Sequence, residues 1–134
     1  MRAAARVLDS YCLISYLEAE AGKEAMIRVL QSANDSGRPL FLSAVNWGEV
    51  FYITLREGGR ERAERAADVI STLPIEVIPV DLELARQAAE WKARARMSYA
   101  DCFAAALAKL KKAELVTGDK EFKQVEGDVR ILWI

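Results

Sequence analysis

The sequence contains no histidine among its 134 residues, and this absence narrows the chemistry open to the protein. Histidine is the usual general base near neutral pH, a frequent metal ligand and a member of Ser-His-Asp triads. Hydrolysis by this chain would therefore have to depend on carboxylates, lysines, hydroxyl groups or a bound metal ion.

Cysteine is also scarce, because the chain has only Cys12 and Cys102, which lie far apart within apolar helical patterns. A disulfide framework or a thiolate zinc site would need more cysteines at closer spacing. We interpret both as reduced thiols of the hydrophobic core, where free cysteine is commonly found.

Long apolar runs are missing as well, since none approaches the roughly 20 residues that cross a bilayer. The N-terminus leads directly into a strand-like run without a separate apolar signal segment. We therefore expect a cytoplasmic protein without a membrane partner. The net charge of −1 excludes a globally basic nucleic-acid binder and leaves local basic patches open. A hydrophobic content of 52% excludes a disordered chain, and 134 residues suit one domain with a substantial core.

Short apolar runs alternate with helical patterns along the chain. The expected strands are 6–8, 39–42, 75–80, 115–116 and 129–134. The expected helices are 10–21, which Gly22 ends, then 23–33, 44–56, 60–71, 81–97 and a buried apolar helix that Asp101 opens. This alternation predicts an α/β protein, a three-layer sandwich with a mostly parallel central sheet and helices on both faces. Pro79 places its strand near an edge of that sheet.

Four carboxylates are expected at one edge of this sheet. Asp9 follows the first strand, and Asp119 follows the strand at 115–116. Glu49 shares the apolar face of the helix after the second strand, and Asp101 begins the buried helix. Crossover helices run antiparallel to their strands, so the beginnings of these helices return to the carboxyl edge of the sheet.

Each of these acids also has an ordinary structural interpretation. Asp9 and Asp119 could each cap the helix or turn that follows. Asp101 could form a capping box with Ser98, and Glu49 could be a partly exposed helix residue.

Asp81 fits the same description, because it too follows a strand and precedes a helix. Topology alone does not separate it from the other four acids. We interpret it as a helix cap, since its strand is expected at the periphery of the sheet.

Four carboxylates without histidine or an evident basic partner would repel one another and raise each other's pKa. A divalent cation removes this conflict, and oxygen ligands suit Mg²⁺ or Mn²⁺ better than Zn²⁺. Such an ion can polarise a phosphoryl oxygen and supply hydroxide from bound water. The residue types therefore favour metal-dependent hydrolysis of phosphodiesters.

Four segments resemble the motifs of the PIN-domain family and, within it, the VapC-like toxin ribonucleases of type II toxin–antitoxin pairs. They are Val7–Ser10, Leu42–Val50, Ser98–Ala106 and Val116–Phe122. They occur in the family's order and spacing, and they cover nearly the whole chain.

This resemblance implies that residues 1–134 form a single PIN-like nuclease domain, a toxin that hydrolyses RNA phosphodiester bonds with Mg²⁺ or Mn²⁺. It implies four catalytic acids that bind the metal: Asp9, Glu49, Asp101 and Asp119. It implies three supporting polar residues: Ser10 and Thr117 as ordering hydroxyls and Asn46 as an additional polar contact. Members commonly form homodimers, and an antitoxin protein wraps them and blocks the acidic pocket.

Two alternatives stay open. The first is a PIN-like binding or scaffold module with weak or no catalysis. The second is another Mg²⁺-dependent phosphate-handling fold. The haloacid-dehalogenase type needs Asp-x-Asp where this chain has Asp9-Ser10-Tyr11, and a phospho-receiver needs paired acids there, so both fit worse.

Basic residues form two clusters: Arg56, Arg60, Arg62 and Arg65, and then Lys92, Arg94 and Arg96. Positions two apart do not share a helix face, so we interpret most of them as solvated helix surface. A minority are expected to contact RNA phosphates, since backbone contacts dominate affinity for nucleic acids.

Overall fold

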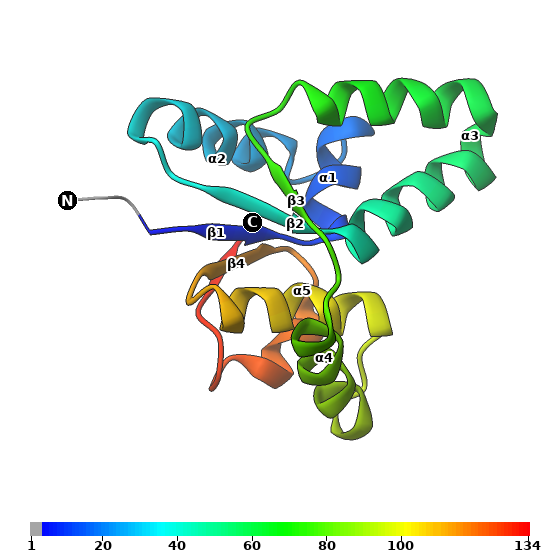
Figure 1. The fold of residues 1–134 in the computed structure, drawn as a ribbon. Helices are drawn as coiled ribbons and strands as arrows, with labels where there is room; N and C mark the ends of the chain where they lie inside the picture. Colours follow the sequence, from blue (N-terminus) through cyan, green and yellow to red (C-terminus); the bar gives the residue numbers. More distant parts are fainter. Residues whose placement is uncertain (1–3) are drawn as a thin grey trace.

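A computed structural model describes residues 4–134 as a five-stranded parallel sheet between two layers of helices (Figure 1). The strands are β1 (Arg6–Leu8), β2 (Leu40–Ser43), β3 (Glu76–Ile78), β4 (Glu114–Thr117) and β5 (Ile131–Trp133). The helices are α1 (Ser10–Leu17), α2 (Lys23–Ser36), α3 (Ala44–Ser71), α4 (Leu82–Arg94), α5 (Tyr99–Leu110) and the 3₁₀ helix η1 (Lys120–Val125). The strand order is β3-β2-β1-β4-β5, and each pair is parallel. The predicted α/β sandwich is confirmed.

Helices cover both faces of the sheet: α1, α2 and α3 lie on one side, and α4, α5 and η1 lie on the other (Figure 1). Leu8 and Val116 pack in the core beneath α1 and α2, whereas Val7 and Leu115 pack against α5. Successive side chains of a strand point to opposite faces, which explains this division. The central strands are therefore buried on both faces, as parallel strands between two helical layers usually are.

The strand β3 lies at an edge of the sheet, as Pro79 predicts. Asp81, which follows it, begins α4 by accepting a hydrogen bond at Oδ1 from the backbone N–H of Leu84, at 2.9 Å. Its interpretation as a helix cap is confirmed.

The helix α3 consists of two arms that meet at a bend (Figure 1). The break is at Gly59, where φ is 84° and ψ is 174°. A positive φ is strained for residues with a side chain, so glycine is the residue that allows this bend. The two helices predicted around the Gly58-Gly59 pair correspond to these arms.

Several predicted boundaries need correction. The first helix ends at Leu17, earlier than the predicted break at Gly22. The helix predicted over 81–97 ends at Arg94, because Ala95 adopts an extended conformation with φ −110° and ψ 150°. Met97 is buried in the loop that follows. Its place in the apolar pattern therefore indicates burial, and extending the helix to Met97 was wrong. The buried helix begins at Tyr99 after the cap Ser98, two residues before Asp101.

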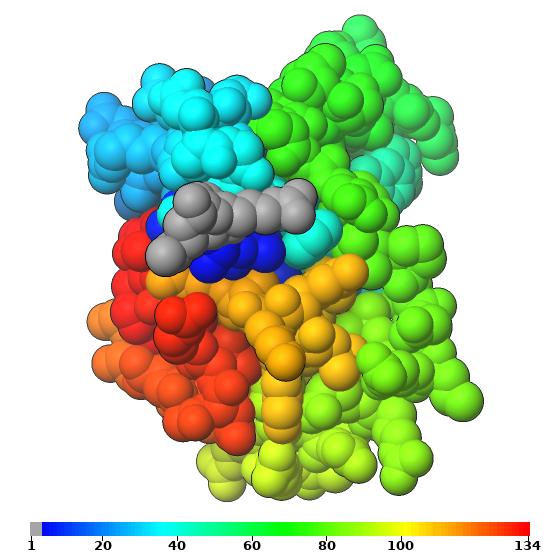
Figure 2. Space-filling model, turned by 60° about the vertical axis from the view of Figure 1, so that its left-hand side comes forward, coloured from blue at the N-terminus to red at the C-terminus, as the bar shows by residue number. Residues whose placement is uncertain are grey.

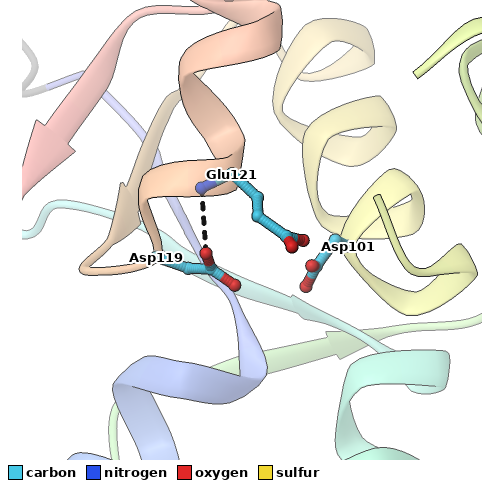
Figure 3. A group of neighbouring side chains, drawn as sticks. All are labelled: Asp101, Asp119 and Glu121. Atoms are coloured by element: carbon cyan, nitrogen blue, oxygen red, sulfur yellow. Dashed lines mark hydrogen bonds between the residues drawn. The ribbon is translucent and has the colours of Figure 1, made fainter. Parts of the chain in front are cut away.

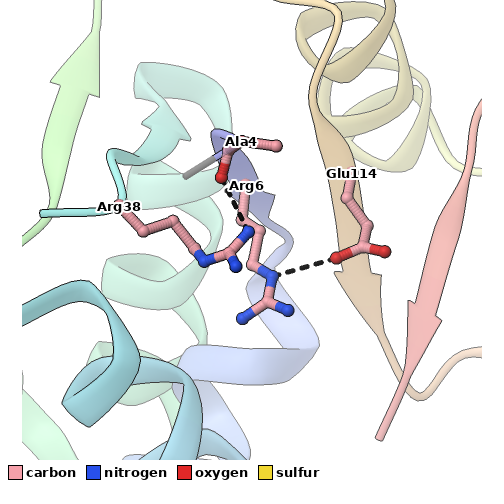
Figure 4. Close-up of polar contacts among 4 residues, drawn as sticks. All are labelled: Ala4, Arg6, Arg38 and Glu114. Atoms are coloured by element: carbon pink, nitrogen blue, oxygen red, sulfur yellow. Dashed lines mark hydrogen bonds and ion pairs between the residues drawn. The ribbon is translucent and has the colours of Figure 1, made fainter. Parts of the chain in front are cut away.

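The amino ends of the strands are joined by polar contacts (Figure 4). Arg6 Nε donates to Glu114 Oε1 at 2.9 Å, and these residues stand opposite each other in the β1–β4 register. Arg38 Nη1 donates to the carbonyl oxygen of Ala4 at 2.7 Å. Figure 2 shows this side of the molecule, with the end of α5 between α4 and the C-terminal segment. Across residues 4–134, no helix is long and apolar enough to cross a membrane.

Candidate metal centre

The carboxyl ends of the strands carry the four predicted acids. Asp9 follows β1 and Asp119 follows β4, while Glu49 and Asp101 lie in α3 and α5. The charges that act on Asp101 come from Asp119, Asp9 and Glu49. The structure therefore brings together four acids that are separated by up to about a hundred residues in the sequence.

Asp9 is the most deeply buried of these acids, with 1% of its surface exposed. Its Oδ1 accepts a hydrogen bond from the backbone N–H of Cys12 at 3.0 Å, which caps α1. Its Oδ2 accepts one from the hydroxyl of Thr117 at 2.5 Å. The pKa of Asp9 is raised to about 6, mainly by burial and to a smaller extent by the charge of Asp119, against the hydrogen bonds from Thr117 and Cys12, which lower it.

Thr117 connects the ends of β1 and β4. Its hydroxyl donates to Asp9 and accepts a hydrogen bond from the backbone N–H of Asp119 at 3.0 Å. One hydroxyl thus fixes the distance between two acids, which is the geometry that an ordering residue requires.

Asn46 is fully buried and uses its whole side-chain amide inside the protein. Its Oδ1 accepts a hydrogen bond from Ser43 at 2.6 Å. Its Nδ2 donates to the hydroxyl of Ser10 and to the carbonyl oxygen of Ala100, each at 3.1 Å. Asn46 therefore joins the beginnings of α1, α3 and α5, and it supports the helix that carries Asp101 without turning a free amide toward the acids.

Asp101 lies in the first turn of α5, where its backbone N–H donates to the hydroxyl of Ser98 at 3.1 Å. Burial is the main reason that its pKa rises to about 7. The charges of Asp119, Asp9 and Glu49 contribute to the same rise, and a hydrogen bond with Ser98 opposes it.

The capping interpretation is confirmed for Asp9, Ser98 and Asp119. Asp119 begins η1 by accepting a hydrogen bond at Oδ1 from the backbone N–H of Glu121, at 2.9 Å. A cap holds one carboxylate oxygen in place and leaves the other available. Capping and metal binding are therefore compatible at Asp119.

Glu121 is the acid that sequence reasoning missed. One carboxylate oxygen from each of Asp101, Asp119 and Glu121 lies within 4.8 Å of the others (Figure 3). A Mg²⁺ ion holds its oxygen ligands at about 2.1 Å, so oxygens that share one ion lie at most about 4.2 Å apart, and this trio spans little more than that. Glu121 is two residues after Asp119 in a short turn, and this proximity is the signal that could have indicated it. Asp9 and Glu49 lie outside this trio.

The acids at this edge lack a cationic partner among the described residues. None of the ion pairs formed within residues 4–134 includes Asp9, Glu49, Asp101 or Asp119. Hard oxygen donors with uncompensated negative charge are the donor set that Mg²⁺ or Mn²⁺ prefers. The residues present therefore fit a divalent cation.

The first basic cluster is mostly engaged with acids on the helix surface. Its ion pairs are Arg60–Glu64, Arg62–Glu18 and Arg65–Glu61. In the second cluster, Lys92 Nζ donates to the carbonyl oxygen of Met97 at 2.8 Å. The guanidinium groups of Arg94 and Arg96 form no ion pair with any residue from 4 to 134.

The parallel sheet and the acids at its carboxyl edge place this protein in the class of α/β folds with a candidate site for a divalent metal. The chain belongs to the PIN-domain family, whose family model matches residues 6–128. The family membership predicted from the four sequence motifs is confirmed. No curated protein sequence matches the chain.

The structure is similar to solved structures of VapC toxins and their complexes. A chain of VapBC2 from Rickettsia felis, bound to promoter DNA, has a TM-score of 0.78 at 15% identity and covers 96% of this chain and 97% of that chain. VapC20 from Mycobacterium tuberculosis, described as a Sarcin-Ricin loop cleaving toxin, has a TM-score of 0.74 at 21% identity over 90% of this chain and 95% of that chain. DNA-bound VapBC from Salmonella typhimurium has a TM-score of 0.76 at 19% identity over 97% and 98%. These likenesses show a shared fold.

Proposed function

We propose that this protein is an endoribonuclease that hydrolyses RNA phosphodiester bonds with Mg²⁺ or Mn²⁺ and acts as the toxin of a toxin–antitoxin pair. The observation that carries the proposal is the convergence of four acids, without a cationic partner among the described residues, at the carboxyl edge of a PIN-domain sheet. The similar structure of VapC20, described as a Sarcin-Ricin loop cleaving toxin, supports the choice of substrate class.

Asp101 and Asp119 are the acids best placed to hold the metal, because they belong both to the predicted set and to the trio with Glu121. Asp9 and Glu49 complete the predicted set. A bound ion would polarise a phosphoryl oxygen and lower the pKa of its water. Thr117 and Asn46 keep the acid-bearing segments in register, and Ser10 accepts one of the hydrogen bonds from Asn46.

RNA must approach this acidic edge despite its own negative charge. Arg94 and Arg96 end α4 and form the loop that leads into α5, the helix that bears Asp101. Their guanidinium groups are exposed and unpaired within residues 4–134. We assign them to phosphate contact, whereas Arg60 and Arg65 serve the helix surface.

The partners follow from the same proposal. We infer that an antitoxin protein covers the acidic edge, and the support is that several similar structures were solved as toxin–antitoxin complexes. A homodimer, a single nuclease domain over residues 1–134 and a cytoplasmic location are further parts of the proposal. Copurification with the product of a neighbouring gene, and the mass of the purified protein in solution, would test the partner and the dimer.

The central experiment is RNA cleavage by purified protein with Mg²⁺ or Mn²⁺, alone and with EDTA. We expect cleavage that EDTA abolishes and that falls at least about 100-fold in Asp9→Asn and Asp101→Asn, because each removes a charge from the metal site. Equal cleavage by the wild type and both variants would assign the activity to a contaminant and contradict the proposal.

Thermal unfolding with Mg²⁺ separates the nuclease from a binding or scaffold module. A ligand that binds only the folded state stabilises it and so raises the melting temperature. At 100 times its Kd the ligand adds about 2.7 kcal/mol to the free energy of unfolding. We expect a rise in the wild type and a smaller one in Asp101→Asn. No rise at millimolar Mg²⁺ would favour the scaffold.

A further inference from the structure

Tyr11 lies at the acidic edge but is neither one of the acids nor one of the predicted supporting residues. It occupies the first turn of α1, two residues after Asp9, and 36% of its surface is exposed. Its ring lies against Gly118, in the segment between Thr117 and Asp119. A side chain from one end of the sequence thus reaches the backbone that connects two site residues at the other.

The contact between Tyr11 and Gly118 leaves no room for a side chain at position 118 while the ring stays where it is. A Cβ added at Gly118 would lie 2.4 Å from Cε1, 2.7 Å from Cζ and 2.9 Å from the hydroxyl oxygen of Tyr11. Distances under 3 Å between such atoms are steric clashes. Gly118 is not among the residues with a positive φ, so its backbone conformation does not itself require glycine. The space that the missing side chain leaves is occupied by the hydroxyl end of the tyrosine.

The Tyr11 hydroxyl has no hydrogen-bond partner among residues 4–134, although the neighbouring polar groups of the site do. Thr117 and Asp119, on either side of Gly118, are bonded to each other. The phenol hydroxyl is therefore free to donate a hydrogen bond to solvent or to a ligand at the edge of the site.

An acidic site that receives RNA needs such donors. A metal ion neutralises charge where it binds, but the next phosphates along the strand still meet carboxylates, and like charges repel. A neutral O–H can donate to a phosphate oxygen without adding charge beside the metal. Hydroxyl side chains are among the common phosphate contacts in complexes with nucleic acids.

We propose that Tyr11 contacts the substrate directly: its hydroxyl donates a hydrogen bond to a phosphate oxygen of the RNA beside the cleaved bond, and Gly118 provides the space that allows it. This inference rests on the proposed ribonuclease function and adds a residue to its substrate contacts. Gly118 is a positioning residue, because it acts through Tyr11.

Tyr11→Phe is the variant that tests the hydroxyl, since it keeps the ring against Gly118. We expect kcat/KM for RNA cleavage to fall roughly tenfold, the size expected for one hydrogen bond to a charged group. The rise in melting temperature with Mg²⁺ should be unchanged. Tyr52→Phe is the matched control, because Tyr52 is exposed in the middle of α3 beside Arg56, and it should cleave like the wild type.

Gly118→Ala tests the position of the ring without changing any acid. The new methyl group would lie 2.4 Å from Cε1 of Tyr11, so the ring must move away from Gly118 and the donor moves with it. We expect a loss of cleavage similar to that of Tyr11→Phe. In the double variant the losses should not multiply, because both changes remove the same contact.

The outcomes separate this inference from the proposed function. If the wild type cleaves RNA with Mg²⁺ and Tyr11→Phe cleaves equally well, the role of Tyr11 is overturned and the ribonuclease stands. Losses that multiply in the double variant would also overturn the shared contact. If the wild type does not cleave, the proposed function fails, and the affinity for a fluorescent RNA oligonucleotide in Ca²⁺ decides the contact. Equal affinity of the wild type and Tyr11→Phe, or no binding by either, overturns it.

Discussion

The two ends of the strands β1 and β4 carry opposite arrangements of charged side chains. At the amino end, Arg6 stands opposite Glu114 and their side chains form an ion pair at 2.9 Å (Figure 4). At the carboxyl end of the same strands, Asp9 and Asp119 are connected through Thr117, and their charges raise the pKa of Asp101. One pair of strands thus ends in matched charges on one side and in like charges on the other.

This difference indicates that the amino end stabilises the fold and that the carboxyl end is suited to binding a ligand. A partly exposed ion pair adds about 0–1 kcal/mol, and removing it leaves the sheet intact. Buried like charges oppose folding, and proteins retain such groups at functional sites. The carboxyl edge therefore carries a destabilising arrangement that a divalent cation would relieve.

The largest difference between the two ends should appear when one acid is neutralised at each end of β4. Asp119→Asn should lower RNA cleavage at least about 100-fold, because it removes a charge from the metal site while an asparagine can still cap η1. Glu114→Gln makes the same chemical change at the start of the strand, so its cleavage should stay within about twofold of the wild type. Rates with Mg²⁺ on one RNA would measure both. Equal losses would mean that the two ends do not differ in function.

Asn46→Ala should give the next largest effect. It leaves Ser43, Ser10 and the carbonyl oxygen of Ala100 without their buried partner, which should lower the free energy of unfolding by about 3 kcal/mol. Arg38→Gln removes a more exposed contact at the amino edge and should cost less than about 1 kcal/mol. Urea unfolding of both variants compares the two edges. A cost at Asn46 as small as that at Arg38 would show that the bridge contributes little.

The pH dependence of stability should report the acidic edge. The pKa of Asp9 is about 6 in the folded protein and 3.8 without the fold, so the folded state holds its proton where the unfolded state has lost it. The free energy of unfolding should therefore fall by about 2 kcal/mol as pH rises from about 4.5 to 7.5 in EDTA. Asp101 contributes in the same direction, weakened by its partial exposure to solvent.

Urea unfolding across this pH range measures the effect. In Asp9→Asn the free energy of unfolding should fall less as pH rises, because the carboxyl group that binds a proton more tightly in the folded state has been removed. Glu114→Gln, at the opposite edge, should keep it. A decline that is the same in the wild type and in Asp9→Asn would assign the effect to other groups.

The smallest effect should come from the ion pair at the amino edge. Glu114→Gln should lower the free energy of unfolding by about 0.5–1 kcal/mol at low salt, and the difference should shrink in about 1 M salt as charges are screened. Urea unfolding at two salt concentrations measures this. A cost that does not change with salt would point to packing of the Glu114 side chain in place of its charge.

The sheet and the acids at its carboxyl edge could be predicted from the sequence, because both depend on short local patterns. Alternating strand and helix patterns predict a parallel sheet, and a parallel sheet brings the residues after its strands to one edge. Asp9 and Asp119 follow directly from this rule, and Asp101 follows from the return of α5 to the same edge. Whether the four acids bind a metal and catalyse cleavage stays a prediction.

The remaining features depend on contacts between distant segments. Asn46 reaches Ser10 and Ala100, which are 36 and 54 residues away in the sequence, and no periodicity encodes those distances. Glu121 joins the acids only because Asp119 holds a short turn in place. The contact of Tyr11 with Gly118 likewise requires the register of β1 and β4, so the glycine looks like an ordinary turn residue in the sequence.

The bridge at Asn46 also has a consequence for the motions of the protein. The backbone N–H groups of Cys12, Asn46 and Asp101 each donate to the side-chain cap of their own helix. Because Asn46 joins these three helix beginnings, none of them can open far without breaking its hydrogen bonds. We expect these amide protons to exchange with deuterium together, as one cooperative unit, although α1, α3 and α5 are far apart along the chain.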